Sequence, residues 1–339
     1  MNLPFIQTKE YLSWHDAVGT KTFYLEFFRD VSQVQDFQID EESTKEKYAV
    51  AACVVLNLRI GKVLYVPYGP VFFDTHRDPT SVSTEEKNKV IKELYEKAVK
   101  ENCAFVRIED ENNIFKNTKY LISPKKKTFS KEGIFQPRME WWLDLNESEE
   151  GLLNRIHKDH KYSIRRAQKE NVEVEIITEN LENYFEHFWK LLKETGERDG
   201  FSLYEENYYR QIFKHPPPRG GWVKKFLVFT KMDDKYLSVA LIVISDKVAN
   251  LVFAGSISEK RELGFNHLMQ WSAILESKKH GCEIYNFGGI TEDGYGKESL
   301  RGVTNFKKKF GGYAKFHGNF LDMPTKKIKY FVYMIRKMI

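Results

Sequence analysis

Cysteine is scarce in this chain of 339 residues, and its three cysteines, Cys53, Cys103 and Cys282, lie far apart. The sequence holds no Cys-x-x-Cys pair and no cluster of cysteine with histidine. This argues against a disulfide framework and against a structural zinc site. We therefore expect three buried, reduced thiols, and no metal or organic cofactor is implied.

Long apolar runs are missing as well. No segment approaches the ~20 apolar residues that a helix needs to cross a bilayer. Residues 1–16 lack a basic start followed by an apolar stretch, so we expect no signal peptide and a cytoplasmic protein. No long heptad region occurs, which argues against a coiled-coil arm.

Several widespread catalytic motifs are absent. The chain has no Gly-x-x-x-x-Gly-Lys-Ser/Thr loop, which argues against a P-loop nucleotidase. It also lacks the Gly-x-Ser-x-Gly elbow and the His-Glu-x-x-His pair.

The residues that are present suit a globular protein with a sizeable core. Apolar residues make up 42% and charged residues 30%, and the length predicts one large domain or two of ordinary size. The formal charge is only +5, but residues 157–169 hold five Lys or Arg and one Asp, and residues 301–315 hold five and no acid. Such patches suit phosphate-bearing ligands, although charge alone favours two solvated basic faces.

Two regions follow the same order of predicted elements. In the first, residues 48–59 and 62–73 are apolar and β-branched and predict paired strands. A capping box, Ser83 with Glu86, begins a predicted helix over residues 84–101, and another strand follows it.

The second region repeats this order. Residues 224–256 predict three strands, residues 265–279 a helix, and residues 282–289 a further strand. Amphipathic stretches at residues 148–170 and 181–195 lie between the two regions. The repeat of order predicts two similar α/β units, each with a mixed, mainly antiparallel sheet flanked by helices.

Two further helices are predicted outside the repeats. A second Ser-x-x-Glu box, Ser202 with Glu205, predicts the start of a helix that runs to residue 214. Residues 326–339 predict a short basic and apolar helix. It could lie on a membrane surface, but we favour packing against the first unit.

The segment Lys260–Asn266 lies between a predicted strand and a predicted helix. It partly matches the Arg/Gln-x-x-Gly-x-Gly/Ala loop with which GNAT-type acetyltransferases hold the pyrophosphate of acyl-CoA at a helix N-terminus. Arg261 and Gly264 match, whereas Asn266 replaces the small third residue. Gly264 could also be a simple turn glycine.

Eight short segments occur along nearly the whole chain in the order PFIQTKEYLSW, YVPYGPVFFD, AFVRIE, YSIRRAQKENVEVEI, TGERDGF, VFAGS, GCEIYNFGGI and NFKKKFGG. Together they resemble the Fem family (FemABX type) of peptidoglycan bridge-forming aminoacyltransferases, in a short form without a coiled-coil arm. The resemblance implies tandem GNAT-like domains. We place the first at residues 1–145 with the C-terminal segment 317–339, and the second at residues 146–316.

The resemblance also implies a reaction. An amino acid would pass from aminoacyl-tRNA to an amine of the stem peptide of a peptidoglycan precursor, with the tRNA as co-substrate and no cofactor. The ester carbonyl becomes a tetrahedral oxyanion, and one charge or donor placed beside it beforehand lowers the barrier by ~3–4 kcal/mol. The family's Phe-Lys pair matches Phe306 and Lys307, which gives this role to Lys307.

The pattern of residues alone leaves another interpretation open. In a strand, Lys307 and Lys309 would share one face, and Phe306 and Lys308 the other. Phe306 and Phe310 would then anchor the core while the lysines face solvent; the pattern favours this, and the resemblance favours a catalytic Lys307. The candidates for contact with tRNA phosphates are Lys158, Arg165, Lys308 and Lys309.

The attacking amine must lose a proton. A lysine-type amine has a pKa of ~10.4, so only about one in a few thousand is neutral at pH 7. By resemblance, Glu109 is the candidate base or orienting group, at a position where relatives often carry Asp. Asp293 and Glu298 are rivals, and proton transfer assisted by the substrate stays open.

Candidate substrate-binding residues also follow from the resemblance. Arg210 matches an arginine that holds the precursor's phosphates, although a surface arginine on an amphipathic helix fits equally well. Gly288 and Gly289 permit positive φ and close approach of a ligand, or else form a tight turn. The other candidates are Tyr209, Phe253, Gly255 and Ser256; for Tyr209 and its neighbour Tyr208, a core position competes with ligand stacking.

Two other functions stay open. One is an acyl-CoA-dependent N-acyltransferase, against which Asn266 counts, and the other is a non-enzymatic module that binds tRNA or anionic lipid. The sequence reveals neither the transferred amino acid nor whether the acceptor is UDP-linked or lipid-linked, but the missing arm favours the soluble precursor. We expect a monomer in the cytoplasm, with contact to the inner face of the membrane as an option.

Overall fold

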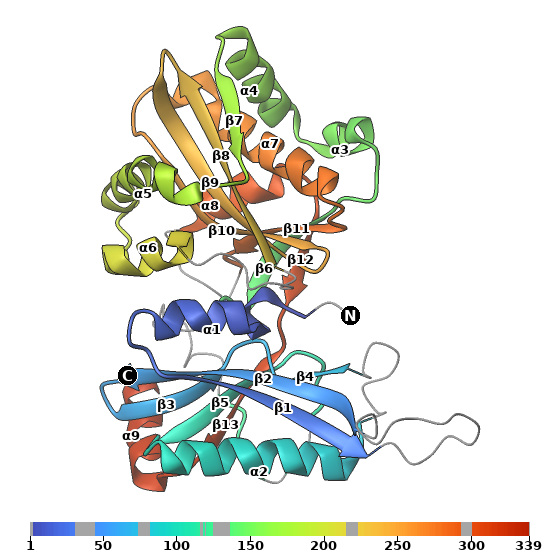
Figure 1. Ribbon diagram of the computed structural model, residues 1–339, viewed down its shortest axis with the longest axis vertical. Helices are drawn as coiled ribbons and strands as arrows, with labels where there is room; N and C mark the ends of the chain where they lie inside the picture. Colours follow the sequence, from blue (N-terminus) through green and yellow to red (C-terminus); the bar gives the residue numbers. More distant parts are fainter. Residues whose placement is uncertain are drawn as a thin grey trace, which may run out of the picture.

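The structure is a computed structural model. It describes residues 3–30, 45–73, 82–115, 118, 120–124, 136–214, 223–292 and 300–338. Two sheets, one in each half of the molecule, are stacked along its long axis, and helix α1 (Lys9–Asp16) lies between them (Figure 1).

The first sheet has six strands in the described chain. Its order is β1 (Thr22–Asp30), β2 (Lys45–Leu58), β3 (Gly61–Val66), β5 (Phe105–Asp110) and β13 (Asn319–Pro324), and the short strand β4 (Val71–Phe72) pairs with β2. Only β3 and β5 pair in parallel among these strands. Helix α2 (Thr84–Lys100) makes the crossover between them, on the side of the sheet away from α1 (Figure 1).

Helix α2 forms where the sequence predicts it. The Ser83 hydroxyl accepts a hydrogen bond from the Glu86 N–H, and the Glu86 carboxylate accepts one from the Ser83 N–H, so the predicted capping box is confirmed. Val90 and Leu94 are fully buried and pack against the sheet. The apolar stripe therefore covers this face of the first sheet.

The second sheet has seven strands in the described chain. Their order is β12 (Tyr313–Phe316), β6 (Met139–Asp144), β11 (Ile284–Gly289), β10 (Val248–Ser256), β9 (Lys235–Ser245), β8 (Val223–Met232) and β7 (Glu173–Ile177). The pair of β10 with β11 is parallel and is joined by helix α7 (Phe265–Lys279), which repeats the arrangement around α2. The fold class predicted from the sequence, two mixed and mainly antiparallel sheets flanked by helices, is confirmed.

Further helices surround the second sheet. Helices α3 (Glu149–Arg155) and α4 (Lys158–Lys169) lie toward one side of it, and α5 (Phe185–Asp199) and α6 (Glu206–Lys214) toward the other (Figure 1). The start predicted for α6 is wrong, because the helix begins at Glu206, after the Ser202–Glu205 box.

The C-terminal segment returns to the first half, as predicted. Helix α9 (Lys327–Met338) packs Tyr330 and Tyr333 against Phe105 of β5. The buried Arg107 forms a two-pronged ion pair with Asp322 of β13, and both of its bonds measure 2.7 Å. These contacts join segments that are 215 positions apart in the sequence.

The predicted boundary at residue 145 does not coincide with the division between the sheets. Strand β6 precedes that boundary, yet it pairs with β11 and β12 of the second sheet. Its buried residue Leu143 belongs to the second core. The domain limits therefore stay a prediction, whereas the membership of β6 in the second sheet is observed.

Candidate active site

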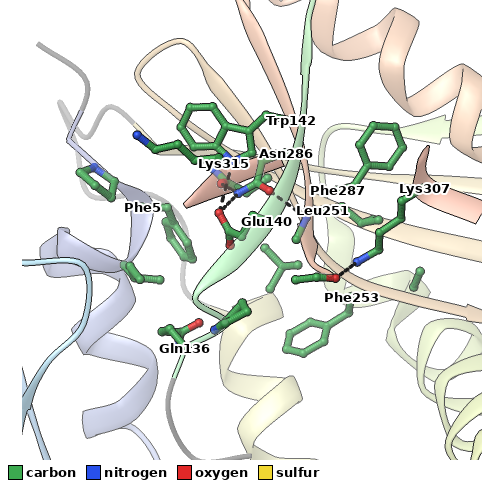
Figure 2. A pocket seen from close by; sticks show the side chains of 18 of the residues that line it. Phe5, Gln136, Glu140, Trp142, Leu251, Phe253, Asn286, Phe287, Lys307 and Lys315 are labelled. Carbon is green, nitrogen blue, oxygen red and sulfur yellow. Dashed lines mark hydrogen bonds between the residues drawn. The ribbon is translucent and has the colours of Figure 1, made fainter. Parts of the chain in front are cut away.

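A cavity of about 1290 Å³ lies between the two halves of the molecule. The N-terminal segment, the turn at Tyr68 and the segment Gln136–Glu140 line it, together with β10, β11 and α8 (Arg301–Lys308) of the second half. Its wall combines apolar rings such as Phe5 and Phe253 with a few charged side chains (Figure 2). A site of this size between two domains is a common place for a ligand.

Lys307 lines this cavity from the last turn of α8. Its ammonium donates a hydrogen bond of 2.6 Å to the Gly289 carbonyl (Figure 2). Burial lowers the pKa of Lys307 to about 8, and the negative charge of Glu140 opposes this shift. At pH 7 the group is still mostly protonated, so it presents a positive charge to the cavity.

The NFKKKF run is helical up to Lys308, so the alternation expected for a strand is wrong. Phe306 and Phe310 lie one turn apart, and their ring centroids are 5.3 Å from each other. Phe306 also contacts the rings of His160 and His267 and lines the cavity. It therefore anchors the helix and contributes to the cavity wall.

The two glycines at the end of β11 bring backbone close to Lys307. Gly288 has a φ of +76°, and a Cβ there would lie 3.9 Å from the Lys307 ammonium. A Cβ on Gly289 would come within 2.8 Å of Pro137. Both glycines line the cavity, and they also form the close turn of the alternative interpretation, so contact with a ligand stays a prediction.

Glu140 of β6 lines the cavity and accepts several hydrogen bonds. Its Oε2 accepts hydrogen bonds from Trp142 Nε1 at 3.2 Å, from Asn286 Nδ2 at 2.9 Å and from His317 Nε2 at 2.7 Å. Burial alone would raise the pKa of Glu140, but the bond and charge of His317, with the other donors, hold it below its usual range. Glu140 is therefore ionised at neutral pH.

His317 connects Glu140 with the first half of the molecule. Its ring stacks on Tyr68, with centroids 3.8 Å apart and planes at 7°. The Glu111 carboxylate lies 3.7 Å from its Nδ1. Burial alone would lower the pKa of His317, but Glu111 and Glu140 raise it to about 9, so the ring is an imidazolium at neutral pH.

Glu109 does not reach the cavity. This buried carboxylate accepts hydrogen bonds from the Tyr65 hydroxyl at 2.5 Å and from the Tyr68 N–H at 2.8 Å. Burial raises its pKa to about 7, although both bonds oppose this shift. Its position supports a role in holding the turn that carries Tyr68, and it does not support direct contact with an acceptor amine.

Arg210 and Tyr209 also lie away from the cavity lining. The Arg210 guanidinium pairs with Glu186 and Glu206, each at 2.6 Å, and covers the ring of Phe185. Tyr209 is buried in the second core. The structure thus matches the interpretation of Arg210 as a surface arginine and of Tyr209 as a core residue.

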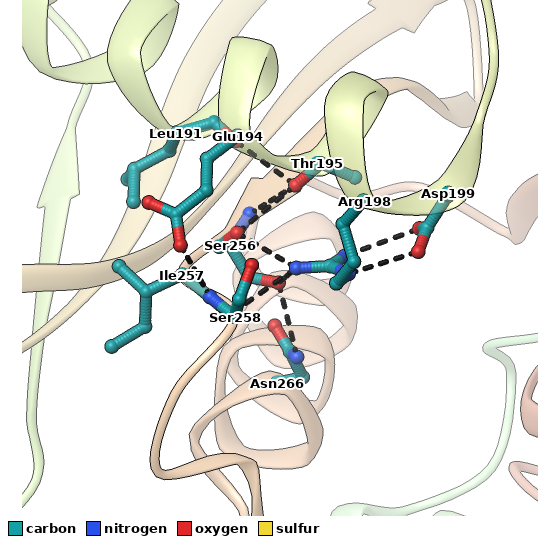
Figure 3. Close-up of polar contacts among 9 residues, drawn as sticks. All are labelled: Leu191, Glu194, Thr195, Arg198, Asp199, Ser256, Ile257, Ser258 and Asn266. Carbon is teal, nitrogen blue, oxygen red and sulfur yellow. Dashed lines mark hydrogen bonds and ion pairs between the residues drawn. The ribbon is translucent and has the colours of Figure 1, made fainter.

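Phe253, Gly255 and Ser256 of β10 line the cavity, and their binding of substrate stays a prediction. Gly255 has a packing reason as well, because a Cβ there would lie 2.6 Å from the backbone nitrogen of Leu192 in α5. Ser256 is engaged with protein partners, since Thr195 and Arg198 bind its backbone, and Asn266 donates to its hydroxyl (Figure 3).

The near-match at Lys260–Asn266 lies beside this cluster. Arg261 and Asn266 line the cavity at the start of α7. Gly264 has a φ of +80°, and a Cβ there would lie 2.2 Å from the Ser163 carbonyl oxygen. Gly264 is therefore required by the packing of α4 against α7, beyond its place in a turn.

The two basic runs of the sequence meet in space. The His157 N–H donates to the Lys309 carbonyl, and the Lys309 ammonium lies 2.8 Å from Asp159. Lys308 is neutralised in part by Glu292. Lys158 and Arg165 stay exposed on α4.

Three residues of the site, Glu111, Glu140 and His317, were not predicted from the sequence. Glu140 stands between Met139 and two tryptophans, and a carboxylate with such apolar neighbours is the signal that could have identified it. His317 and Glu111 had no comparable signal. Asp293 and Glu298 lie outside the described residues.

Two kinds of feature are absent from the described residues. They contain no group of three or more His, Cys, Asp or Glu side chains that could hold a metal ion. Nor does the described part of the chain contain a helix with the length and apolar character needed to span a membrane.

Comparison with known proteins places the chain in a family. The FemAB family matches residues 125–215 and 223–337. Lipid II:glycine glycyltransferase of Staphylococcus aureus (strain USA300) is 23% identical over 331 positions, which cover 76% of this chain and 78% of that protein.

Two solved structures share the fold. The crystal structure of FemX covers 98% of this chain and 95% of its own, with a TM-score of 0.76 and 19% identity. A tandem GNAT protein from the clavulanic acid biosynthesis pathway covers 82% and 79%, with a TM-score of 0.50 and 9% identity. These likenesses confirm the predicted tandem GNAT-like fold, and the family match, which spans more than half of the sequence, shows that the chain belongs to the FemAB family.

Proposed function

We propose that this protein is an aminoacyltransferase that moves an amino acid from aminoacyl-tRNA to an amine of a peptidoglycan precursor, and so builds an interpeptide bridge. Membership of the FemAB family supports this reaction class. So does the likeness to a glycyltransferase whose name specifies lipid II as its acceptor.

The observation that carries the proposal is the position of Lys307. Its ammonium lines a cavity large enough for two substrates, and it is held by the Gly289 carbonyl. When an amine attacks an ester, the carbonyl oxygen becomes negative, and a cation fixed at that point stabilises the transition state more than the substrate. We assign this task to Lys307, with Phe306 fixing the helix that carries it.

The test is a transfer assay with purified protein. Mixed aminoacyl-tRNAs are offered with the UDP-linked pentapeptide precursor or with lipid II in detergent micelles, and products are read by mass spectrometry. We expect one acceptor to gain the mass of an amino acid. Failure with every pair of tRNA and acceptor would overturn the proposal.

The alternative of an acyl-CoA-dependent N-acyltransferase has one observation in its favour. Arg261 and the start of α7 border the cavity, at the place where GNAT enzymes hold a pyrophosphate. Titration with acetyl-CoA distinguishes the two, since micromolar binding would favour the alternative. A module that binds only RNA or lipid would show neither transfer nor acyl-CoA binding.

A further inference from the structure

We propose that Glu140 is a second catalytic residue of this cavity, whose carboxylate contacts the nitrogen of the acceptor amine while Lys307 contacts the oxygen of the ester carbonyl. The inference rests on the proposed aminoacyl transfer and adds the group that meets the nucleophile. It replaces Glu109 in that position, because Glu109 lies outside the cavity lining.

The two oxygens of Glu140 have unequal surroundings. Oε2 has the three donors described above, whereas Oε1 has one contact within the described structure, the Tyr68 hydroxyl at 3.2 Å. That hydroxyl has a single hydrogen, and it lies 2.6 Å from the Pro137 carbonyl, which is the better acceptor distance. Oε1 is therefore an ionised oxygen without a full hydrogen bond, on a residue that lines the cavity.

Glu140 and Lys307 are brought together by one pair of residues. Gly289 of β11 lies opposite Glu140 of β6 in the antiparallel register, and such partners have Cα atoms about 4.5–5.5 Å apart. The Gly289 carbonyl holds the Lys307 ammonium. The cavity is thus lined by an anion on β6 and by a cation on α8 (Figure 2).

This arrangement matches the charges of the reaction. The acceptor ammonium first loses one proton to water, and the neutral amine then attacks. As its nitrogen forms a bond to the ester carbon, the nitrogen becomes positive and the carbonyl oxygen negative. Glu140 faces the first charge and Lys307 the second, so both stabilise the zwitterionic intermediate. The ester C–O bond then breaks, and a proton passes from the nitrogen to the departing ribose oxygen, which leaves a neutral amide and a free hydroxyl.

Glu140 acts as an anion in this scheme, and it does not need to take up a proton. Its hydrogen bonds to His317, Asn286 and Trp142 keep it charged and fix its direction. The His317 imidazolium is itself held by Glu111 and by stacking on Tyr68 of the first half. The contact between the two halves therefore keeps the Glu140 carboxylate charged and oriented before the amine binds.

The first experiment compares Glu140→Gln with the wild type in the transfer assay. We expect a fall in kcat of about 100-fold, with the KM for aminoacyl-tRNA within threefold. The melting temperature should fall as well, because the buried His317 imidazolium loses a charged partner. Glu140→Asp keeps the charge on a shorter arm, and we expect it to lose about tenfold. Asp144→Asn, a carboxylate on the same strand outside the cavity lining, is the matched control and should behave as the wild type.

A second measurement does not depend on turnover. Calorimetry compares the binding of the UDP-linked precursor with that of the same precursor acetylated at its free amine. We expect the wild type to prefer the free amine at least tenfold, and Glu140→Gln to lose this preference. If Glu140→Gln fails to fold, a weakened preference in Glu140→Asp supports the inference, and an unchanged one overturns it.

The outcomes separate this inference from the proposed function. Wild-type protein that transfers nothing to either acceptor overturns the proposed function, and the inference falls with it. Wild-type transfer together with near-normal kcat in Glu140→Gln overturns the inference alone. Equal losses in Glu140→Gln and Glu140→Asp would also overturn it, because they would indicate a structural role.

Discussion

At the residue scale, the first prediction concerns the N–H donors of Lys307 that are still available to a substrate. An ammonium has three N–H donors, and within the described structure the Gly289 carbonyl takes one of them. Two donors are left for an oxyanion. We predict that Lys307→Met, of similar length but uncharged, lowers kcat by 100- to 1000-fold and changes the KM for aminoacyl-tRNA by less than threefold.

Single-turnover kinetics at several pH values would check this. Because the ammonium form is needed and its pKa is about 8, kcat should fall as the pH rises through that value. Lys308→Met is the control, since Lys308 pairs with Glu292 at the edge of the same helix. A loss in Lys308→Met equal to that in Lys307→Met would contradict a specific role for position 307.

Glu109 gives a second prediction. Since its carboxylate holds Tyr65 and Tyr68 and does not line the cavity, Glu109→Gln should keep kcat within about threefold of the wild type. The free energy of unfolding should fall by about 1 kcal/mol, because one hydrogen bond is weakened. Urea denaturation together with the transfer assay would decide. A loss of kcat above 100-fold in a stable variant would restore Glu109 as a candidate base.

Residues that belong to a motif could be selected from the sequence. Phe306, Lys307, Gly288 and Gly289 were selected by resemblance and local pattern, and all four line the cavity, while their roles stay predictions. Glu140 was missed because its function depends on neighbours that come from distant strands, and no spacing along the chain reveals such neighbours. A strand-like segment shows which face a side chain takes, but not which cavity that face borders.

At the scale of elements, the pair Arg107–Asp322 joins β5 to β13. Both side chains are fully buried, and Tyr330 of α9 donates to the same carboxylate at 3.0 Å. Asp322→Ala would leave a guanidinium buried without its anion. We predict a loss of about 3–5 kcal/mol in the free energy of unfolding.

Chemical denaturation would measure this loss. Glu283→Ala, which removes an exposed ion pair with Lys247, is the control and should cost less than about 1 kcal/mol. An equally small effect of Asp322→Ala would mean that the structure has relaxed around Arg107.

Elements with a strong periodic signal were predicted well, and short ones were not. Helices α2 and α7 begin and end within a residue of their predicted limits. The NFKKKF run was ambiguous because a short aromatic and basic segment fits both periods. Its helical form follows from Phe306 and Phe310, which pack one turn apart against His160.

At the scale of the whole molecule, the joined basic runs predict how tRNA binds. Lys158 and Arg165 are exposed on α4, whereas Lys308 and Lys309 pair with acids. We predict that Lys158→Glu with Arg165→Glu weakens tRNA binding at least tenfold. Each lost phosphate contact should also reduce the slope of log K against log salt by ~0.7–0.9.

Filter binding over a range of salt concentrations would measure both quantities. Lys247→Glu, on the turn between β9 and β10, reverses one exposed charge elsewhere and serves as the control. Equal losses in the two variants would indicate a general effect of net charge and would argue against a tRNA surface on α4.

The two-sheet architecture was predicted from the repeat of element order. The assignment of every strand to its sheet was not predicted. The predicted first unit already combined residues 1–145 with the C-terminal segment 317–339, but the boundary at residue 145 left β6 with the first sheet. The structure pairs β6 with β11 of the second sheet. Strand exchange of this kind depends on pairing across the molecule, which local patterns do not contain.

The return of β13 has a consequence for biosynthesis. Arg107 and Asp322 are 215 positions apart, so at ~5–20 residues per second the ribosome needs roughly 10–40 s to supply the partner of β5. During that interval β5 has an unpaired edge, which is a template for unwanted association. The nascent first half must therefore be shielded, or stay unfolded, until β13 has been synthesised.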